Sequence, residues 1–160
     1  MRGLTLLAAV LGLAACAGSA QAQSRKPTAH ETAAIRDCAK KSEDTVDAGE
    51  ETCLFKLVAE PCMAPVGSAA ARVMADCSQI DGAIWDALLN ENYKGLLAAL
   101  DDEQAAKARA MQRAWIAYRD TTCGFYYDKI RGTMAGFMEA ACVARETARR
   151  AMLLKFFTRL

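Results

Sequence analysis

Residues 112–123 read Gln112-Arg113-Ala114-Trp115-Ile116-Ala117-Tyr118-Arg119-Asp120-Thr121-Thr122-Cys123, and no other stretch combines tryptophan, tyrosine, arginine and cysteine so densely. Trp115 precedes Tyr118 by three residues and Arg119 by four. These spacings place side chains on one side of an α-helix. The stretch therefore predicts a helix whose aromatic side chains share one face.

The chain beyond this stretch is equally typical of helices. It contains three prolines, Pro27, Pro61 and Pro65, and no run of five or more residues alternates β-branched and aromatic side chains as a strand does. We predict an all-α protein, a disulfide-stapled bundle of about four to five helices that pair as antiparallel hairpins. The expected helices span residues 31–41, 47–59, 69–100, 103–127 and 136–157.

Local signals set several boundaries of these helices. Pro61 is expected to end the second helix, and Cys77-Ser78 is a candidate break within the third. Asp101 and Asp102 are expected to end the third helix and to cap the fourth, because carboxylates are favourable at a helix N-terminus. We interpret these acidic residues as a cap rather than as a binding site.

Apolar side chains at helical spacing predict where the core lies. On the helix 103–127 they fall within one arc, with Arg119 and Cys123 at its edge. The arc comprises Met111, Trp115, Tyr118, Thr122, Phe125 and Tyr126. A facing stripe on the helix 69–100 comprises Ile84, Leu88, Leu89, Tyr93, Leu96, Leu97 and Leu100. We expect these two helices to form the main core together.

Charged residues beside this arc need partners. Arg119 can lay its guanidinium along the indole of Trp115 by packing and cation–π contact, and the alternative is an exposed Arg119 that serves as a recognition group. Asp120 points about 100° away from Arg119 and needs a different partner. The candidate partners on the last helix are Arg145, Arg149 and Arg150.

A second polar group is predicted on the facing helix. Asn90 and Tyr93 lie three residues apart and face the Trp115 region if the two helices form a hairpin. A buried amide or hydroxyl requires a hydrogen-bond partner. We therefore expect a buried polar network that links Asn90, Tyr93 and Arg119.

The first 22 residues are typical of a secretory signal peptide. Arg2 precedes a short apolar run over 4–15, and residues 20–22 (Ala-Gln-Ala) fit a cleavage site. The run is shorter than the roughly 20 residues that span a bilayer, and no transmembrane segment is expected. A second interpretation stays open, because residues 13–16 (Leu-Ala-Ala-Cys) match a lipobox in which Cys16 is lipidated.

Both interpretations place the protein in the cell envelope, in the periplasm or secreted, and lipidation would add a lipid anchor. After removal of the signal peptide, residues 23–30 are expected to form a flexible polar lead. Residues 31–160 then form a single helical domain, a length that fits one core.

The cysteines predict disulfide bonds. Of the seven cysteines, Cys16 is cleaved away or lipidated, which leaves an even number in an oxidising compartment. No pair has the Cys-x-x-Cys spacing of zinc or redox sites. Pairs that are symmetric about the predicted turns face each other in antiparallel hairpins. These pairs are Cys38 with Cys53, Cys62 with Cys77, and Cys123 with Cys142.

Charge and side-chain chemistry argue against several classes of function. Arg2 is the only charged residue of the signal peptide, so the rest of the chain has 19 basic and 19 acidic residues, without the basic excess of a nucleic-acid-binding protein. The single histidine, His30, falls in the polar lead, which disfavours a Ser-His or Cys-His catalyst. The carboxylates of residues 43–51 lie in a predicted exposed turn. We expect no enzyme, no metal and no cofactor.

A set of spaced motifs points to a family. The set comprises Trp85-Asp86-x-x-Leu89-Asn90-x-x-Tyr93-x-x-Leu96, the run Met111 to Asp120 followed by Cys123, Gly132-Thr133, and Cys142 with Thr147 and Arg150. Over roughly residues 53–154 the chain resembles the LprI-like lysozyme inhibitor N-terminal domain, a family of small exported bacterial proteins. The segment with Cys53, Cys62 and Cys77 resembles one branch of it.

The resemblance implies a periplasmic or lipid-anchored helical domain that inhibits lysozyme by non-catalytic binding. Two segments suit such binding. The acidic turn 43–51 could approach a basic enzyme, and the loop 128–134, held at its base by the Cys123–Cys142 bridge, could enter a cleft that carries two catalytic carboxylates. The alternative function is a periplasmic interaction module with another partner. With either function we expect the motif residues to belong to the core. These residues are Asn90, Tyr93, Trp115, Tyr118, Arg119 and Asp120.

Overall fold

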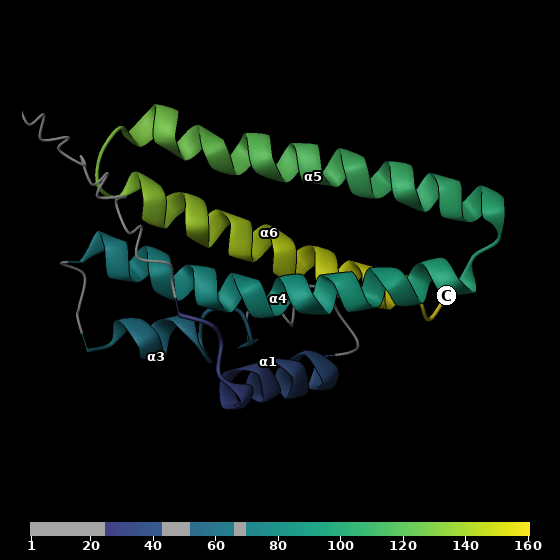
Figure 1. Ribbon diagram of the computed structural model, residues 1–160, viewed down its shortest axis with the longest axis horizontal. Coiled ribbons are helices and arrows are strands. Elements are labelled where there is room, and N and C mark those ends of the chain that lie inside the picture. Colours follow the sequence, from purple (N-terminus) through teal and green to yellow (C-terminus); the bar gives the residue numbers. More distant parts are fainter. Residues whose placement is uncertain (1–24, 43–51, 66–69) are drawn as a thin grey trace, which may run out of the picture.

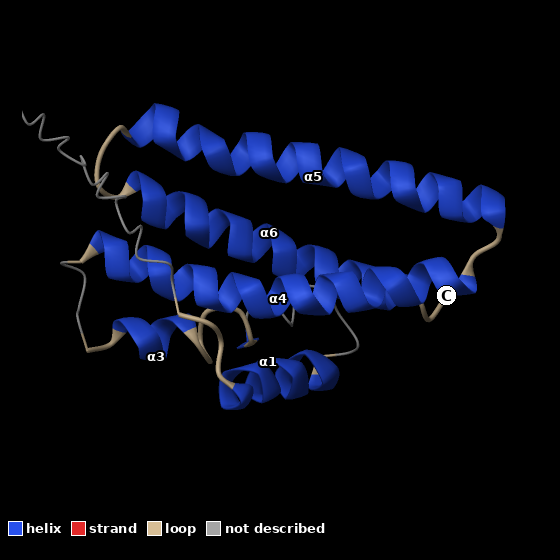
Figure 2. Ribbon diagram, viewed as in Figure 1, coloured by secondary structure: helices blue, strands red, loops and turns tan. Residues whose placement is uncertain are grey.

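The computed structural model describes residues 25–42, 52–65 and 70–160, and within these ranges it contains only helices and no strand (Figures 1 and 2). The all-α prediction is confirmed. The helices, labelled as in Figure 1, are α1 (Ala29–Lys41), α3 (Ala59–Met63), α4 (Ala71–Ala99), α5 (Asp102–Ile130) and α6 (Ala135–Phe157).

The three long helices form one layer in which α6 lies between α4 and α5 (Figure 1). Helix α5 runs antiparallel to α6 beside it and to α4 beyond, and α1 and α3 cover the side of α4 away from α5. The largest helix contact is between α4 and α6, and the second is between α5 and α6. The prediction that the helix 69–100 packs its core against the helix 103–127 is therefore wrong.

The small side chains of α6 explain this difference. A Cβ added to Gly82 of α4 would lie 3.3 Å from the Cβ of Ala144, so the two backbones approach closely. Helix α6 also buries Ala140, Ala141, Ala148 and Ala151. The alanine-rich sequence lets α6 contact α4 on one face and α5 on another, and the α4 stripe with Ile84, Leu89 and Leu96 then packs mainly on α6.

The predicted arc of α5 is only partly buried. Tyr118 is 53% exposed and Phe125 is 61% exposed, so the prediction that both are core residues is wrong, and Thr122 is exposed as well. Because α5 packs against a single long neighbour, its buried face is narrow. That face carries Ala105, Ala108, Gln112 and Cys123. Met111 and Trp115 pack on the core from the side.

Two helix starts, those of α5 and α1, follow capping chemistry. The side chain of Asp101 accepts the N–H of Gln104, and the side-chain oxygen of Gln104 accepts the backbone N–H of Asp101. This capping box confirms the predicted cap. Thr28 and Glu31 form the same box at α1, so this helix begins at Ala29 and includes His30, which the sequence had placed in the flexible lead. Helix α4 continues through Cys77-Ser78, so the candidate break does not form.

The predicted helix 47–59 is not continuous in its described part. Residues 47–51 lie outside the described residues, Thr52 is helical, residues 53–58 form turns, and the short helix α3 follows. Pro61 lies in the first turn of α3 rather than beyond the end of a helix. A proline is tolerated there because the first N–H groups of a helix have no partner within it.

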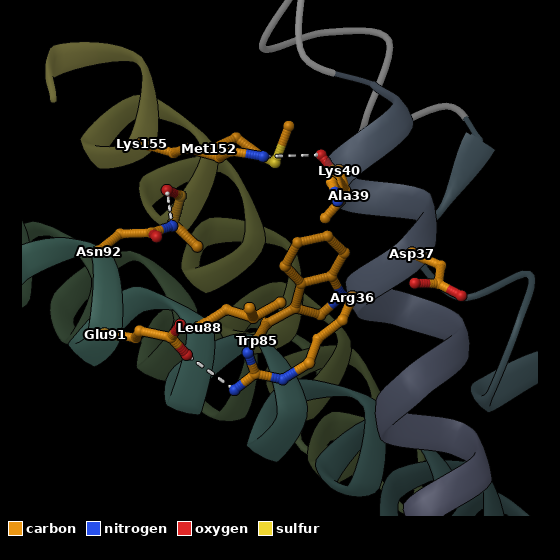
Figure 3. Close-up of a pocket in the computed structure, with 11 residues that line it drawn as sticks. Arg36, Asp37, Ala39, Lys40, Trp85, Leu88, Glu91, Asn92, Met152 and Lys155 are labelled. Atoms are coloured by element: carbon orange, nitrogen blue, oxygen red, sulfur yellow. Dashed lines mark hydrogen bonds and ion pairs between the residues drawn. The ribbon is translucent and has the colours of Figure 1, made fainter. Parts of the chain in front are cut away.

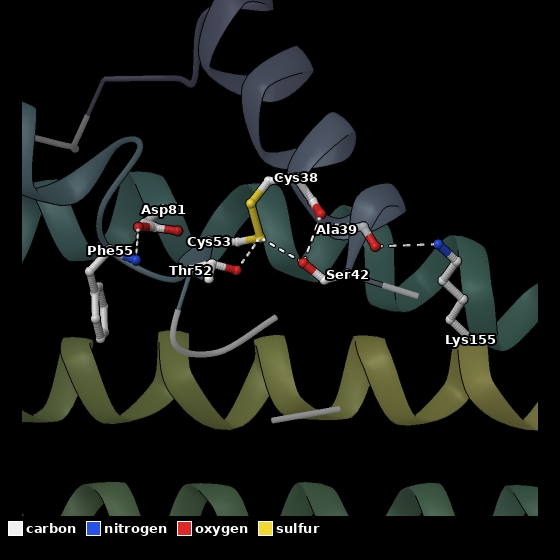
Figure 4. The surroundings of a disulfide bond; sticks show 8 residues. All are labelled: Cys38, Ala39, Ser42, Thr52, Cys53, Phe55, Asp81 and Lys155. Carbon is white, nitrogen blue, oxygen red and sulfur yellow. Dashed lines mark hydrogen bonds between the residues drawn. A yellow bond between two sulfur atoms is a disulfide. The ribbon is translucent and has the colours of Figure 1, made fainter. Parts of the chain in front are cut away.

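Three disulfides join the cysteines in the predicted sequential pairs. Cys38–Cys53 ties α1 to the turns 53–58, Cys62–Cys77 ties α3 to α4, and Cys123–Cys142 ties α5 to α6. Figure 4 shows the first bridge, beside which the hydroxyl of Ser42 donates to the carbonyl of Cys38. The second bridge therefore fastens α3 to the layer, the third joins two helices within it, and the first joins α1 to the turns that precede α3.

We expect reduction of these bridges to abolish cooperative folding. A disulfide stabilises a small domain by about 2 to 4 kcal/mol, mainly by restricting the unfolded chain, so loss of all three, about 6 to 12 kcal/mol, is comparable to the whole stability of an ordinary domain, about 5 to 15 kcal/mol. The measurement is thermal unfolding followed by circular dichroism with and without excess reductant. An unchanged melting temperature after verified reduction would contradict the prediction.

Asp81 is a carboxylate on α4 with no exposed surface. Its Oδ2 accepts the backbone N–H of Phe55 at 3.0 Å, as Figure 4 shows, while its Oδ1 lacks a hydrogen-bond partner among the described residues. Burial raises the pKa of Asp81 to about 6, against the opposing effect of the N–H groups of Ala59 and Phe55 and of the nearby Trp85 indole. The folded protein therefore binds this proton more tightly than the unfolded chain.

We expect Asp81→Asn to remove a pH dependence of stability. Because the folded pKa is raised from the unfolded value of about 3.9, the contribution of Asp81 is full below about pH 4 and is lost as the pH rises through about 6. The free energy of unfolding of the wild type, minus that of the variant, should fall by on the order of 2 kcal/mol between pH 4 and pH 7.

Urea denaturation at a series of pH values measures this difference. Asparagine keeps an acceptor for the N–H of Phe55, so the variant is expected to fold. The control is Asp86→Asn, which changes an exposed carboxylate of the same helix. If the free energy of unfolding depended on pH in the same way in the wild type and in Asp81→Asn, the raised pKa of Asp81 would be refuted.

Candidate functional site

The end of the α5–α6 hairpin, residues 127–134, is the candidate binding site that the sequence predicted as the loop 128–134. Helix α5 extends to Ile130, three residues beyond the expected Tyr127. The connection to α6 is correspondingly short. We call residues 127–134 the hairpin end.

Local hydrogen bonds fix the shape of the hairpin end. Arg131 caps α5 in the left-handed conformation, with φ at 49°, and its N–H donates to the carbonyl of Tyr127 at 3.2 Å. Its Nε donates to the carbonyl of Asp128 at 3.0 Å. The N–H of Ala135 then donates to the carbonyl of Gly132 at 3.0 Å and closes a turn.

Two contacts hold the base of the hairpin end. The sulfurs of Cys123 and Cys142 join α5 to α6, and Cys123 is fully buried. The hydroxyl of Tyr127 lies over Gly136, where an added Cβ would come within 3.1 Å of it. A side chain at position 136 would push Tyr127 away, which explains why glycine suits the first turn of α6.

The hairpin end presents both apolar and basic side chains to solvent. Tyr127, Ile130 and Met134 are among the exposed large apolar residues of the protein, and Lys129 and Arg131 are exposed beside them. Tyr127 and Ile130, three residues apart, share one side of α5. Such a combination of apolar contact area with cations is typical of a protein-binding surface.

Residues 112, 115 and 119 of α5 form a polar cluster with Arg150 where α5 packs on α6. The guanidinium of Arg119 lies 5.0 Å from the ring centre of Trp115, which confirms the predicted cation–π contact. A second guanidinium, that of Arg150 on α6, lies 5.6 Å from the same ring. Arg150 is 7% exposed, and its Nε donates to Oε1 of the buried Gln112 at 2.9 Å.

The predicted partners of Asp120 and Asn90 are wrong. Asp120 pairs with its neighbour Arg119, with the closest atoms 2.7 Å apart, rather than with an arginine of α6. Asn90 is exposed and donates to Asp86 one turn earlier, so it joins no network with Tyr93 and Arg119. The buried polar pair is instead Gln112 with Arg150, and the position of Gln112 three residues before Trp115 was the available signal.

A groove of about 370 Å³ lies between α1, α4 and α6 (Figure 3). Several of its polar side chains, those of Arg36, Glu91, Asn92 and Lys155, bond to the protein itself. Arg36 of α1 pairs with Glu91 of α4 at 2.8 Å, and Lys155 of α6 donates to the carbonyl of Ala39 at 3.4 Å. We interpret the groove as the place where α1 docks on the layer.

Other predicted chemistry can be placed only in part. In the ranges 25–42, 52–65 and 70–160, no three His, Cys, Asp or Glu side chains gather where they could hold a metal ion. The acidic turn 43–51 lies outside the described residues, as do the signal peptide and Cys16.

Burial lowers the pKa of Arg150. The side chain of Arg150 joins α6 to α5 through Gln112 and does not face a substrate.

We expect Gln112→Ala to destabilise the protein by about 1 to 3 kcal/mol, because the Nε of Arg150 would lose its buried acceptor. Gln112→Glu keeps an acceptor for Arg150 and should lose less stability. Urea denaturation of both variants tests this, with Gln79→Ala on the exposed side of α4 as a control. An equal loss in the alanine and glutamate variants would show that the hydrogen bond is unimportant.

Comparison with known proteins finds a matching family model and a relative. The sequence model of the family described as lysozyme inhibitor LprI matches residues 62–154. An uncharacterized protein of Rhizobium meliloti (strain 1021) is 36% identical over 93 residues, which are 49% of this chain and 67% of that protein. No solved structure matches the chain. The segment that the family model matches contains α4, α5, most of α6 and the whole hairpin end.

Proposed function

The chain belongs to the LprI lysozyme inhibitor family, and from this membership we propose that it is an exported cell-envelope protein that inhibits lysozyme by binding without catalysis. We place the contact with lysozyme at the hairpin end. The observation that carries this assignment is a surface with exposed apolar and basic side chains on a base fixed by a buried disulfide.

The chemistry of lysozyme favours such a surface. Its cleft contains two catalytic carboxylates that flank the scissile bond. Lys129 and Arg131 can donate charge-assisted hydrogen bonds to carboxylates, which are stronger than bonds between neutral groups. Tyr127, Ile130 and Met134 would supply apolar contact around them. The hairpin end is thus suited to enter the cleft and to exclude the polysaccharide.

The shape of the hairpin end also favours binding. Association loses less entropy when the binding segment is already ordered. The helical cap at Arg131, the turn at Gly132 and the bridge below them order this segment before any partner arrives. The acidic turn 43–51, which lies outside the described residues, remains a second candidate contact.

The disulfides also support the proposed location. Disulfides persist in oxidising compartments such as the bacterial periplasm, and three of them staple the described part of this chain. None of its described helices is long and apolar enough to cross a membrane. A secretory signal peptide over residues 1–22 would deliver the protein to the periplasm or outside, and lipidation of Cys16 would keep it on the envelope.

We expect the purified protein to slow lysis of bacterial cell walls by lysozyme in a turbidity assay. The variant Lys129→Gln/Arg131→Gly should weaken inhibition by about tenfold or more, because it removes two cations that would face carboxylates. Glycine suits the left-handed backbone at position 131, so this variant is expected to fold normally.

The matched control is Lys94→Gln/Arg113→Gln, which removes the same charge from exposed positions of α4 and α5. This control should inhibit as the wild type does. Inhibition that falls equally in both double variants would reject the hairpin end and indicate general charge attraction. Absence of inhibition at excess protein, across several lysozymes, would reject the proposed function itself.

A further inference from the structure

Helix α5 leaves much of its surface without a partner. It lies at the edge of the layer (Figure 1), and its largest contact with another described helix is the one with α6. Its exposed surface nevertheless carries the large apolar side chains of Ile116, Tyr118 and Phe125. Exposed apolar side chains that gather on one element are typical of a protein-binding surface. We call this exposed surface of α5 the outer face.

The charged residues of the outer face alternate in blocks along the helix. From the start of α5 to the cap after its end, the blocks read acidic, basic, acidic and basic, and every member is exposed. The blocks are Asp102 with Glu103, Lys107 with Arg109 and Arg113, Asp120 with Asp128, and Lys129 with Arg131.

These charges are available for a partner. Within the described residues, Arg113 and Asp128 form no ion pair. Lys107 and Asp120 pair only with neighbours on their own helix. Exposed pairs of this kind contribute little to stability, so these two side chains can turn to another chain at small cost.

The order of the blocks is complementary to itself when it is reversed. Read in the opposite direction, acidic, basic, acidic and basic becomes basic, acidic, basic and acidic. Two antiparallel copies of α5 therefore bring opposite charges together. A two-fold axis beside Ala117 sets the register, because it places each residue opposite the one equally far on the other side of that position.

In this register all the charge blocks find a partner of opposite sign. Position 117 lies within one residue of the middle of α5 (Asp102–Ile130), so the two copies overlap along almost the whole helix. In the second copy, Asp120 falls one position from Arg113, Asp128 falls one position from Lys107, and Arg131 falls directly opposite Glu103.

The same register brings the exposed apolar side chains together. Ile116 and Tyr118 lie on the two flanks of Ala117, and the two-fold axis keeps each flank of the helix on its own side. Each of these side chains would therefore meet its own copy near the axis. Phe125 falls one position from Ala110 of the second copy, whose small side chain leaves room for the ring. An apolar centre with charged pairs around it is the arrangement of specific protein interfaces.

From these observations we propose that the outer face of α5 binds the outer face of a second copy of this chain, as an antiparallel pair with the two-fold axis beside Ala117. Helix α5 has 29 residues and is therefore about 43 Å long and about 10 to 12 Å wide. Its contact covers roughly 500 Å² on each copy, the size of a weak and reversible interface. We expect a dissociation constant on the order of 10 to 100 μM.

Sedimentation velocity of the purified, disulfide-bonded protein, at about 1 to 500 μM, measures this association. The sedimentation coefficient should rise from that of a monomer to that of a dimer, and the association should weaken at high salt because the charged pairs are exposed. The measurement contains no lysozyme, so its outcome and that of the lysis assay are independent. Because Arg131 belongs to the proposed lysozyme contact as well, the variants change Arg113 and Asp120 instead.

Two charge reversals test the register. Arg113→Glu places a carboxylate beside Asp120 of the second copy, and Asp120→Lys places an ammonium group beside Arg113. Each variant alone should raise the dissociation constant about tenfold or more, because symmetry makes two pairs repulsive at once. Mixed in equal amounts, the two variants should associate about as tightly as the wild type, because every pair in the mixed dimer joins opposite charges.

The recovery in the mixture separates an interface from a structural role. Residues 113 and 120 are seven positions apart and cannot pair within one helix, so a change inside one chain does not predict recovery. Lys94→Glu, a charge reversal at an exposed position of α4, is the control and should associate as the wild type does. Circular dichroism should show the same melting curve for all of these variants.

Ala117→Arg tests the position of the axis. Ala117 is exposed and arginine is a good helix former, so this variant is expected to fold, while two cations meet at the axis and association is lost. The inference is overturned if the wild type stays monomeric at every concentration, which would leave the outer face to a different partner. It is also overturned if folded Ala117→Arg still associates, if the single reversals associate as the wild type does, or if their mixture does not recover.

Discussion

The close contact between α4 and α6 determines where the other elements lie. Gly82 and Ala144 approach until their side-chain positions nearly touch, and such close packing brings the apolar side chains of both helices out of water. Because α4 occupies that face of α6, α5 must pack on another face. The outer side of α5 then stays in solvent, which is why Tyr118 and Phe125 are exposed despite their helical spacing.

The opposite side of α4 carries the less favourable features of the molecule. Asp81 is buried as a carboxylate and Phe55 has a strained backbone, and each would favour unfolding of the turns 53–58 on its own. Two disulfides flank these turns, one at Cys53 and one at Cys62. By restricting the unfolded chain they offset local costs that the small helices α1 and α3 cannot offset by packing.

The sequence was most informative where one local rule decides the outcome. The symmetric positions of the cysteines about turns predicted all three pairs, and Asp101 predicted a helix start. It was least informative about which helix faces which. Trp115 lies beside Arg119 as spacing requires, but helical periodicity carries no information on the helix that supplies Arg150 to the same ring. The positive φ of Phe55 depends on the distant Asp81, so no local signal predicts it.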